Sequence, residues 1–186
     1  MSYVERLVEA YRSFVALPWP ADIAPPQRVW MAVYPPDQER RLRLNVPEFG
    51  TATLQADHAW NLIDITTLFE HWMAGHEYAE AYFEGPELLE TSLPEFFEQL
   101  VAEVRAELER YDDPAGVVGL LGAGALFGLG DAVKVSALID AVNDAIAGRL
   151  LVFFPGQYEH NRYRLLDARD GWNYLATPIT AEGARR

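Results

Sequence analysis

Apolar residues along the chain follow two alternating patterns, one typical of buried strands and one typical of amphipathic helices. Short apolar, β-prone runs that end at proline, glycine or polar residues occur at 29–34, 60–66, 116–122 and 149–156. Apolar residues at helical spacing occupy the segments 4–15, 37–58, 67–111 and 135–146. Strands that alternate with helices in this way predict a parallel sheet with helices on both faces.

The first of these strands, Val29–Tyr34, is apolar at every position and stops at Pro35-Pro36, as expected of a strand buried on both faces. Pro47 is expected to kink or split the helix that follows. No internal repeat, low-complexity tract or long linker interrupts the pattern. We therefore predict a single α/β domain over residues 1–186, a three-layer Rossmann-like arrangement with a mainly parallel sheet and a C-terminal hairpin.

Local signals predict where several elements begin and end. Ser2 can cap the first helix, and Ser92 with Glu95 three residues later has the spacing of a capping box. The fourth strand is expected to break at Pro155-Gly156. Asp170-Gly171 then predicts the turn of the C-terminal hairpin, which joins two short strands.

Composition narrows the class of protein. The 186 residues include 28 acids against 15 lysines and arginines, a formal net charge of −13, and no cysteine. Without cysteine there are no disulfides, thiolate nucleophiles or cysteine-bound metals. The apolar runs are too short to span a membrane, and the first residues lack the basic-then-apolar order of a secretory signal. We expect a soluble cytoplasmic protein without membrane contact.

The acidity is concentrated in one segment. Residues 77–113 contain twelve acids and two arginines, a net charge of −10. Such a segment either forms a solvated helix face or steers a basic partner toward the protein, and it would repel a nucleic-acid backbone. The arginines form two small groups: Arg40, Arg41 and Arg43, and Arg162, Arg164 and Arg169. These groups keep DNA binding as an alternative, although we do not expect direct DNA contact.

The segment LLGAGALFGLGDAVKVS, residues 120–136, comes nearest to a known ligand motif. It follows a predicted strand and precedes a predicted helix, which is the context of a phosphate-binding loop. Phe127 stands where the dinucleotide fingerprint needs a third glycine, and Lys134 lies too far from Gly124 for a Walker-type loop. We keep Gly122, Gly124 and Gly128 as a candidate ligand loop, with a structural or interface loop as the other interpretation.

Other reactive residue types do not form a recognisable catalytic set. Asp37 and Asp64 follow predicted strands and could hold a magnesium ion, but acids at strand ends are also ordinary helix caps. His71 and His76 are five residues apart, so they do not share a helix face as zinc ligands four apart would. We therefore predict no catalytic residues, no metal and no cofactor.

Several stretches of the chain carry a resemblance to a known family. They are LPW after the first helix, RVWMAVYPPDQERRLR, HAWNLIDIT, FEHWMAGHEYAEAYFEGPE, LLGAGALFG and GRLLVFFPGQYEHNRYRLLDARDGWNYLATPIT. In this combination the chain closely resembles the BrxB family of the bacterial BREX phage-defence systems, formerly a domain of unknown function. The resemblance covers nearly the whole chain, and the last stretch is its most specific part.

The resemblance implies a role, because the family has no established catalytic residues that could be carried over. It implies a non-enzymatic accessory component, encoded beside a large ATPase, an adenine methyltransferase and the phosphatase-like protein PglZ. Such a component would act through protein–protein interaction, with PglZ as the first expected partner and self-association left open. A nucleotide-binding or degenerate NTPase-like domain, or a DNA-binding component of the same system, is the alternative.

Aromatic and arginine side chains gather just past the fourth predicted strand. Residues of these types are the usual anchors of protein interfaces. The predicted partner-binding residues are Tyr158, His160, Asn161, Arg162, Tyr163 and Trp172. The other interpretation is that Tyr158 and Trp172 close the core at the end of the domain.

Overall fold

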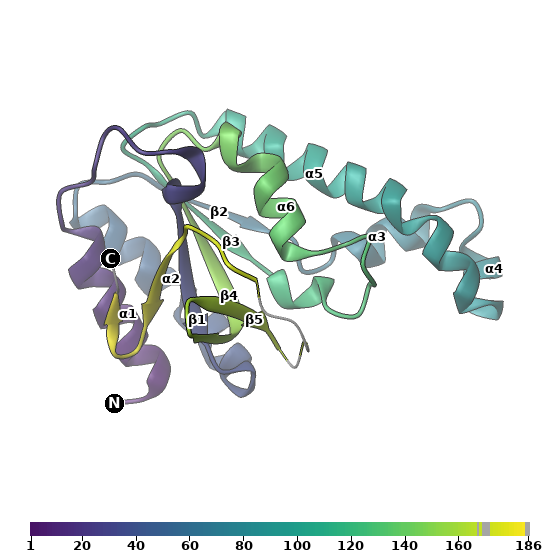
Figure 1. Ribbon diagram of the computed structural model, residues 1–186, viewed down its shortest axis with the longest axis horizontal. Coiled ribbons are helices and arrows are strands. Elements are labelled where there is room, and N and C mark those ends of the chain that lie inside the picture. The colour runs from purple at the N-terminus through teal and green to yellow at the C-terminus, as the bar shows by residue number, and fades with distance from the viewer. Residues whose placement is uncertain (167, 169–171, 185–186) are drawn as a thin grey trace.

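The strands form a mostly parallel, open sheet with helices on both faces (Figure 1). The computed structural model describes residues 1–166, 168 and 172–184. Across the sheet the strand order is β2-β3-β4-β1-β6-β7, and β5 pairs with β4 outside this path. The strand bounds are β1 Val29–Tyr34, β2 Trp60–Asp64, β3 Val117–Leu121, β4 Arg149–Glu159, β5 Arg162–Leu165, β6 Thr177–Thr180 and β7 Gly183–Ala184. The pairs from β2 to β6 are parallel, whereas β5 and β7 are antiparallel to their neighbours.

The helices divide between the two faces of the sheet. Their bounds are α1 Tyr3–Val15, α2 Glu39–Gln55, α3 Leu68–Gly75, α4 Ala79–Glu84, α5 Leu93–Arg110 and α6 Val135–Val142, with short 3₁₀ segments η1 Pro25–Arg28, η2 Pro36–Gln38, η3 Pro86–Thr91, η4 Ala123–Leu126 and η5 Asn143–Ala145. Helices α1 and α2 contribute to one hydrophobic core, and α3, α5 and α6 contribute to the other. None of the described helices is both long and apolar enough to cross a membrane.

Strand β1 separates the two cores and contributes to both. Val29, Met31 and Val33 belong to the core under α5 and α6, whereas the alternate residues belong to the core under α1 and α2. Successive side chains of a strand point to opposite faces, so an unbroken apolar run is what a strand covered on both sides requires. The predicted bounds of this strand and its burial on both faces are confirmed.

The order of the strands explains why the helices divide in this way. The chain leaves β1, passes through α2 and enters β2 at the far edge of the sheet, and it then returns inward through β3 and β4. Parallel crossovers are almost always right-handed, so crossovers that run in opposite directions place their helices on opposite faces. This arrangement confirms the predicted α/β class with its mainly parallel sheet.

Several predicted boundaries are confirmed and others are corrected. Ser2 caps α1, and Glu5 completes a capping box there. Helix α2 continues through Pro47 as one helix and is not split. The capping box predicted at Ser92 is wrong: the Ser92 hydroxyl lies 2.5 Å from the Tyr82 hydroxyl and makes no cap hydrogen bond.

The largest correction concerns the end of the fourth strand. Strand β4 does not break at Pro155-Gly156 but runs on to Glu159, and its second half pairs with β5. The predicted turn at Asp170-Gly171 lies outside the described residues. A strand was expected to follow this turn, but the structure has there an isolated bridge between Trp172 and Tyr163. Thr177–Thr180 forms a separate strand, β6, parallel to β1.

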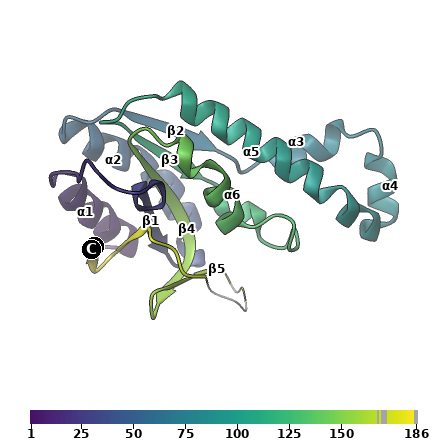
Figure 2. The ribbon, with the colours of Figure 1, turned by 45° about the horizontal axis from the view of Figure 1, so that its top comes forward.

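A helical arm projects from one side of the sheet (Figure 2). It consists of α3, α4, η3 and the first half of α5, with α4 at its far end. Trp72 and Phe96 join the base of the arm to the core, because their rings lie 5.5 Å apart and both belong to the cluster under α5. Tyr82 of α4 is buried within the arm itself.

Candidate functional site

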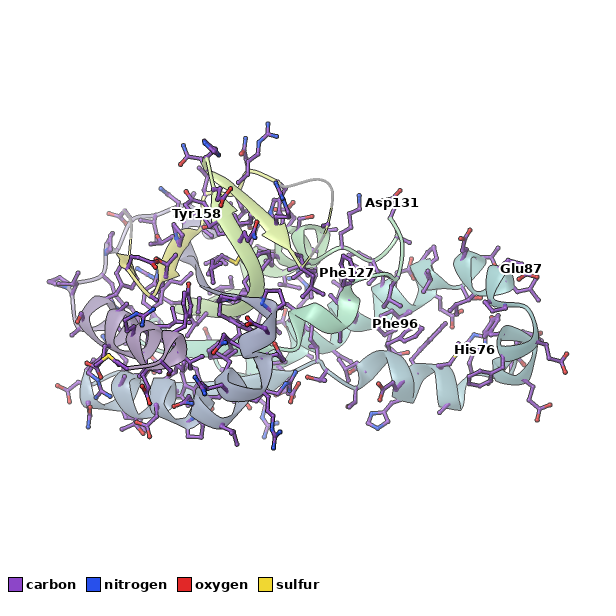
Figure 3. All side chains as sticks on the ribbon, turned by 90° about the horizontal axis from the view of Figure 1, so that it is seen from below. His76, Glu87, Phe96, Phe127, Asp131 and Tyr158 are labelled. Atoms are coloured by element: carbon purple, nitrogen blue, oxygen red, sulfur yellow. The ribbon has the colours of Figure 1, made fainter. Side chains whose placement is uncertain are left out.

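The candidate residues lie around the carboxyl ends of the strands, where ligands of open α/β sheets usually bind. Figure 3 shows Tyr158 on the β4–β5 hairpin and Phe127 and Asp131 on the segment after β3. In this view Phe127 and Asp131 lie between the hairpin and the arm that carries His76 and Glu87. Three surfaces are therefore available: the hairpin, the glycine-rich segment and the arm.

The hairpin turns at His160 and Asn161. Both residues have positive φ, 51° and 61°, and they connect the paired residues Glu159 and Arg162. Two central residues with positive φ define the type I′ turn, whose twist matches that of a β-ribbon. Asparagine tolerates this conformation, so Asn161 was a signal for the turn that the sequence prediction did not use.

The predicted partner-binding residues of the hairpin divide into exposed and buried ones. His160, Asn161 and Arg162 are exposed, and Tyr158 is half-buried. The Tyr158 hydroxyl donates a 3.1 Å hydrogen bond to Asn161 Oδ1. Tyr163 is fully buried, and its hydroxyl donates to the carbonyl of Ala176 at 2.8 Å. Tyr163 is therefore corrected from a partner-facing residue to a core residue.

Trp172 packs on the same core. Its ring lies 5.4 Å from that of Phe154 and 5.7 Å from that of Tyr163, and its backbone exchanges two 2.9 Å hydrogen bonds with Tyr163. Burial raises the pKa of the Tyr163 hydroxyl well above its ordinary value. Trp172 is half-buried, so it combines a structural contact with a partly accessible surface. Arg169, the last member of the second arginine group, lies outside the described residues.

The glycine-rich segment is folded tightly against the strand ends. Gly122 has a φ of 101°, and an added Cβ would lie 2.6 Å from the Thr66 nitrogen. Gly124 lies against Pro155 of β4, with an added Cβ 3.1 Å from the proline ring. Only Gly128 of the three, with φ 86°, has open space around it.

Part of the backbone of this segment is engaged in its own hydrogen bonds. The N–H groups of Ala125 and Phe127 donate to carbonyls three residues earlier, at 2.9 and 3.1 Å, and that of Val133 does the same at 3.4 Å. A phosphate cradle needs free N–H groups that converge on one point. Several of these groups are already engaged, and Gly122 and Gly124 lie against Thr66 and Pro155, so the geometry favours the structural or interface interpretation of the loop.

A chain of polar contacts crosses the carboxyl edge and was not predicted from the sequence. Arg43 binds Glu39 through Nε at 2.7 Å and Thr66 Oγ1 through Nη2 at 2.9 Å, and its Nη1 lies 3.8 Å from Asp64. The Tyr34 hydroxyl donates to Glu39. Burial, and then the Glu39 carboxylate, raises the pKa of Tyr34.

These polar contacts show the roles of several residues whose function was uncertain from the sequence. Asp64 accepts hydrogen bonds from the backbone and the hydroxyl of Thr66, so it acts as a turn cap beside Arg43. Among the described residues, no group of three histidine, aspartate or glutamate side chains is arranged to hold a metal ion. Arg40 and Arg41 are exposed, whereas Arg43 of the same group is engaged in the contacts at this edge.

The arm carries exposed apolar side chains in acidic surroundings. Phe83 is 74% exposed, Tyr78 57% and Leu88 49%. Five exposed glutamates share this part of the arm: Glu77, Glu80, Glu84, Glu87 and Glu90. The sequence indicated the acidity of this segment, but it did not indicate that three large apolar residues remain in contact with solvent.

Comparison with known proteins yields no match. No protein-family model, no curated protein and no solved structure is similar to the chain at a significant level.

Proposed function

We propose that this protein is a non-enzymatic, cytoplasmic accessory component of a BREX phage-defence system, acting through protein–protein interaction with PglZ as the expected partner. The sequence resemblance to the BrxB family supports the choice of system and partner. We class the fold as Rossmann-like on the basis of its helix-covered parallel sheet. A fold of this kind hosts many functions, so the proposal depends on the surfaces that the protein presents.

The observation that carries the proposal is the end of the arm. Tyr78, Phe83 and Leu88 lie within one short segment, and all three expose about half or more of their surface. Large apolar residues that stay exposed among polar ones are a feature of protein-binding surfaces. The glutamates around them select a partner with a basic face, because opposite charges guide association and disfavour other partners.

Replacing Phe83 and Leu88 together by serine should weaken partner binding by about 2 kcal/mol or more, as the loss of central apolar anchors does. Both side chains are exposed, so the free energy of unfolding should change by no more than about 0.5 kcal/mol. Co-purification with PglZ and calorimetric titration would measure the first effect, and thermal melts the second. Leu54→Ser, at another exposed position (61%) on α2, is the matched control and should bind normally.

Two results would contradict this proposal. The double variant could bind as well as the wild-type protein, which would remove the arm from the interface. The wild-type protein could also fail to bind PglZ and every other BREX component at micromolar concentration, which would remove the proposed role. Raising the salt concentration should weaken a genuine complex at this acidic surface, since exposed charges are screened.

The hairpin gives an independent prediction for the same partner. Arg162 is exposed on β5, at the end of the ribbon that Tyr158 supports. If the hairpin also contacts the partner, Arg162→Ala should weaken binding by about 2 kcal/mol and leave the melting temperature nearly unchanged. Arg110→Ala on α5 is the matched control for loss of one exposed arginine. Equal binding by both variants would exclude the hairpin from the interface.

A further inference from the structure

Arg149, the first residue of β4, is a buried cation. It is 6% exposed, and among the described residues it is the only charged side chain that is buried. Its guanidinium carbon lies 5.0 Å from the centre of the Trp19 ring and 5.9 Å from that of Trp30. Burying a charge is costly unless other groups compensate it, so its surroundings require an explanation.

The partners of Arg149 are uncharged. Nη1 donates to the carbonyl of Gly148 at 3.0 Å and Nη2 to that of Pro20 at 2.8 Å. A guanidinium has five N–H donors, and these two hydrogen bonds use only two of them. The charged side chain that acts on it is Arg28, a second cation. Burial, and then Arg28, lower the pKa of Arg149, which is the opposite of what a carboxylate partner would do.

Arg149 also lines a cavity of about 570 Å³. Its walls are mainly aromatic and apolar, and a few polar side chains are placed among them. The apolar lining includes Pro18, Trp19, Ile23, Trp30 and Leu175, and the polar side chains besides Arg149 are Gln27, Tyr158, Asn161 and Thr177. Small-molecule sites have this size and this composition, an apolar enclosure with a few polar groups that fix orientation.

The rings and the cation together define the chemistry that fits. Trp19 and Trp30 meet edge to face, with ring centres 5.3 Å apart. Trp19 is fixed by a hydrogen bond from Nε1 to the Val15 carbonyl and by the ring of His58, which stacks on it at 3.7 Å. Because His58 and Arg149 lie against the Trp19 ring, a flat apolar group would meet these rings at their edges, an arrangement that aromatic pairs favour. A carboxylate accepts two parallel N–H groups from one guanidinium, and it would supply the negative charge that Arg149 lacks.

We propose that this cavity binds an organic anion, with a carboxylate at Arg149 and a flat apolar body beside Trp19 and Trp30. The carboxylate belongs either to a free small molecule or to the end of a peptide chain, and both sources present the same chemistry to the cavity. The inference goes beyond the proposed partner binding. The arm takes no part in this cavity, whereas Tyr158 and Asn161 of the hairpin line it.

The wild-type protein provides the first test. Phenylacetate and its uncharged isostere phenylacetamide are titrated in low-salt buffer, with calorimetry and tryptophan fluorescence as readouts. Loss of a charge-assisted hydrogen bond should make the amide at least about tenfold weaker than the acid. A tripeptide that ends in phenylalanine, compared with its C-terminal amide, distinguishes the two sources: a peptide acid that binds more tightly than phenylacetate indicates a chain terminus, and the reverse indicates a free anion.

Substitution of Arg149 provides the second test. Arg149→Met keeps much of the side-chain volume and removes the charge, so it should abolish the preference for acid over amide. Arg110→Met, at an exposed arginine on α5, should keep the preference. A folded Arg149→Met protein that still prefers the acid would overturn the inference. So would a wild-type protein that binds acid and amide equally, or neither at about 10 mM, and these two results do not depend on whether the variant folds.

Discussion

Replacing Phe153 by alanine is expected to destabilise the protein by about 3 to 5 kcal/mol, the usual cost of removing a buried aromatic ring. Phe153 is fully buried on β4, and its ring meets that of Phe49 edge to face at 5.0 Å. Its strand lies between β1 and β3, so the cavity would open between the centre of the sheet and α2. Loss of partner binding by this variant should follow only from unfolding.

Urea denaturation measured by circular dichroism would give the change in the free energy of unfolding. Arg162→Ala, which lies on the exposed end of the ribbon, serves as the reference and should change this free energy by no more than about 0.5 kcal/mol. A Phe153→Ala protein as stable as this reference would show that the core under α2 is not packed as described.

The second large effect is expected at Gly156. An added Cβ would lie 2.0 Å from the carbonyl oxygen of Arg164 and 2.9 Å from the ring of Phe154. The first of these atoms is backbone of the paired strand, so Gly156→Ala must push β5 away from β4. We expect a cost of about 3 kcal/mol, at the upper end for overpacking, together with loss of the hairpin as an ordered surface.

Hydrogen exchange at the amides of β5 would report the displaced ribbon, and thermal melts would report the cost. Gly75→Ala is the matched control, because an added Cβ there meets no atom within 4 Å and the position closes a helix. That variant should melt at or slightly above the wild-type temperature. Unchanged protection of β5 in Gly156→Ala would contradict the pairing of these two strands.

The sequence was sufficient to predict β1, β2 and β3 and the first half of β4. The unbroken apolar run of β1 is the pattern of a buried strand, and the apolar spacing of α1 is the pattern of an amphipathic helix. In both segments the local pattern agrees with the structure that forms. Ser2 could be identified as a cap because its partner, Glu5, is local in the chain. Elements specified by their own neighbours in sequence were therefore predictable.

Pro155-Gly156 shows why the end of β4 was not predictable. These residues are ordinary strand breakers, yet the strand passes through both. Pro155 lies beyond Val152, the last residue of β4 that pairs with β3, so its missing N–H is not needed by that ladder. Gly156 is required because β5 approaches too closely for a side chain. Both reasons exist only once distant strands have paired.

The candidate surfaces were predictable only in part. The acidity of 77–113 is visible in the sequence, but the exposure of Phe83 depends on the arm extending past the sheet. Ser92 has a capping-box spacing, yet its hydroxyl forms a hydrogen bond with the Tyr82 hydroxyl and does not cap the helix. Tyr158 and Tyr163 look alike in sequence and pair opposite each other on the same face of the ribbon, with rings 4.7 Å apart. Tyr163 is the more buried of the two because Phe154 and Trp172 pack against it. The exposure or burial of these side chains depends on packing between segments that are distant in sequence.

The position of β1 between β4 and β6 also constrains how the protein is made. Val29 pairs with Leu150, and Trp30 pairs with Thr177, so the central strand has no neighbour in the first half of the chain. Pairings between residues so far apart in sequence slow folding, because a long loop must close before any contact rewards it. On the ribosome, β1 emerges early and must wait with its apolar residues uncovered until β4 has been synthesised. Helix α1, whose buried residues pack on the same strand, is the only described helix already synthesised when β1 appears, and it can shield one of its faces during that interval.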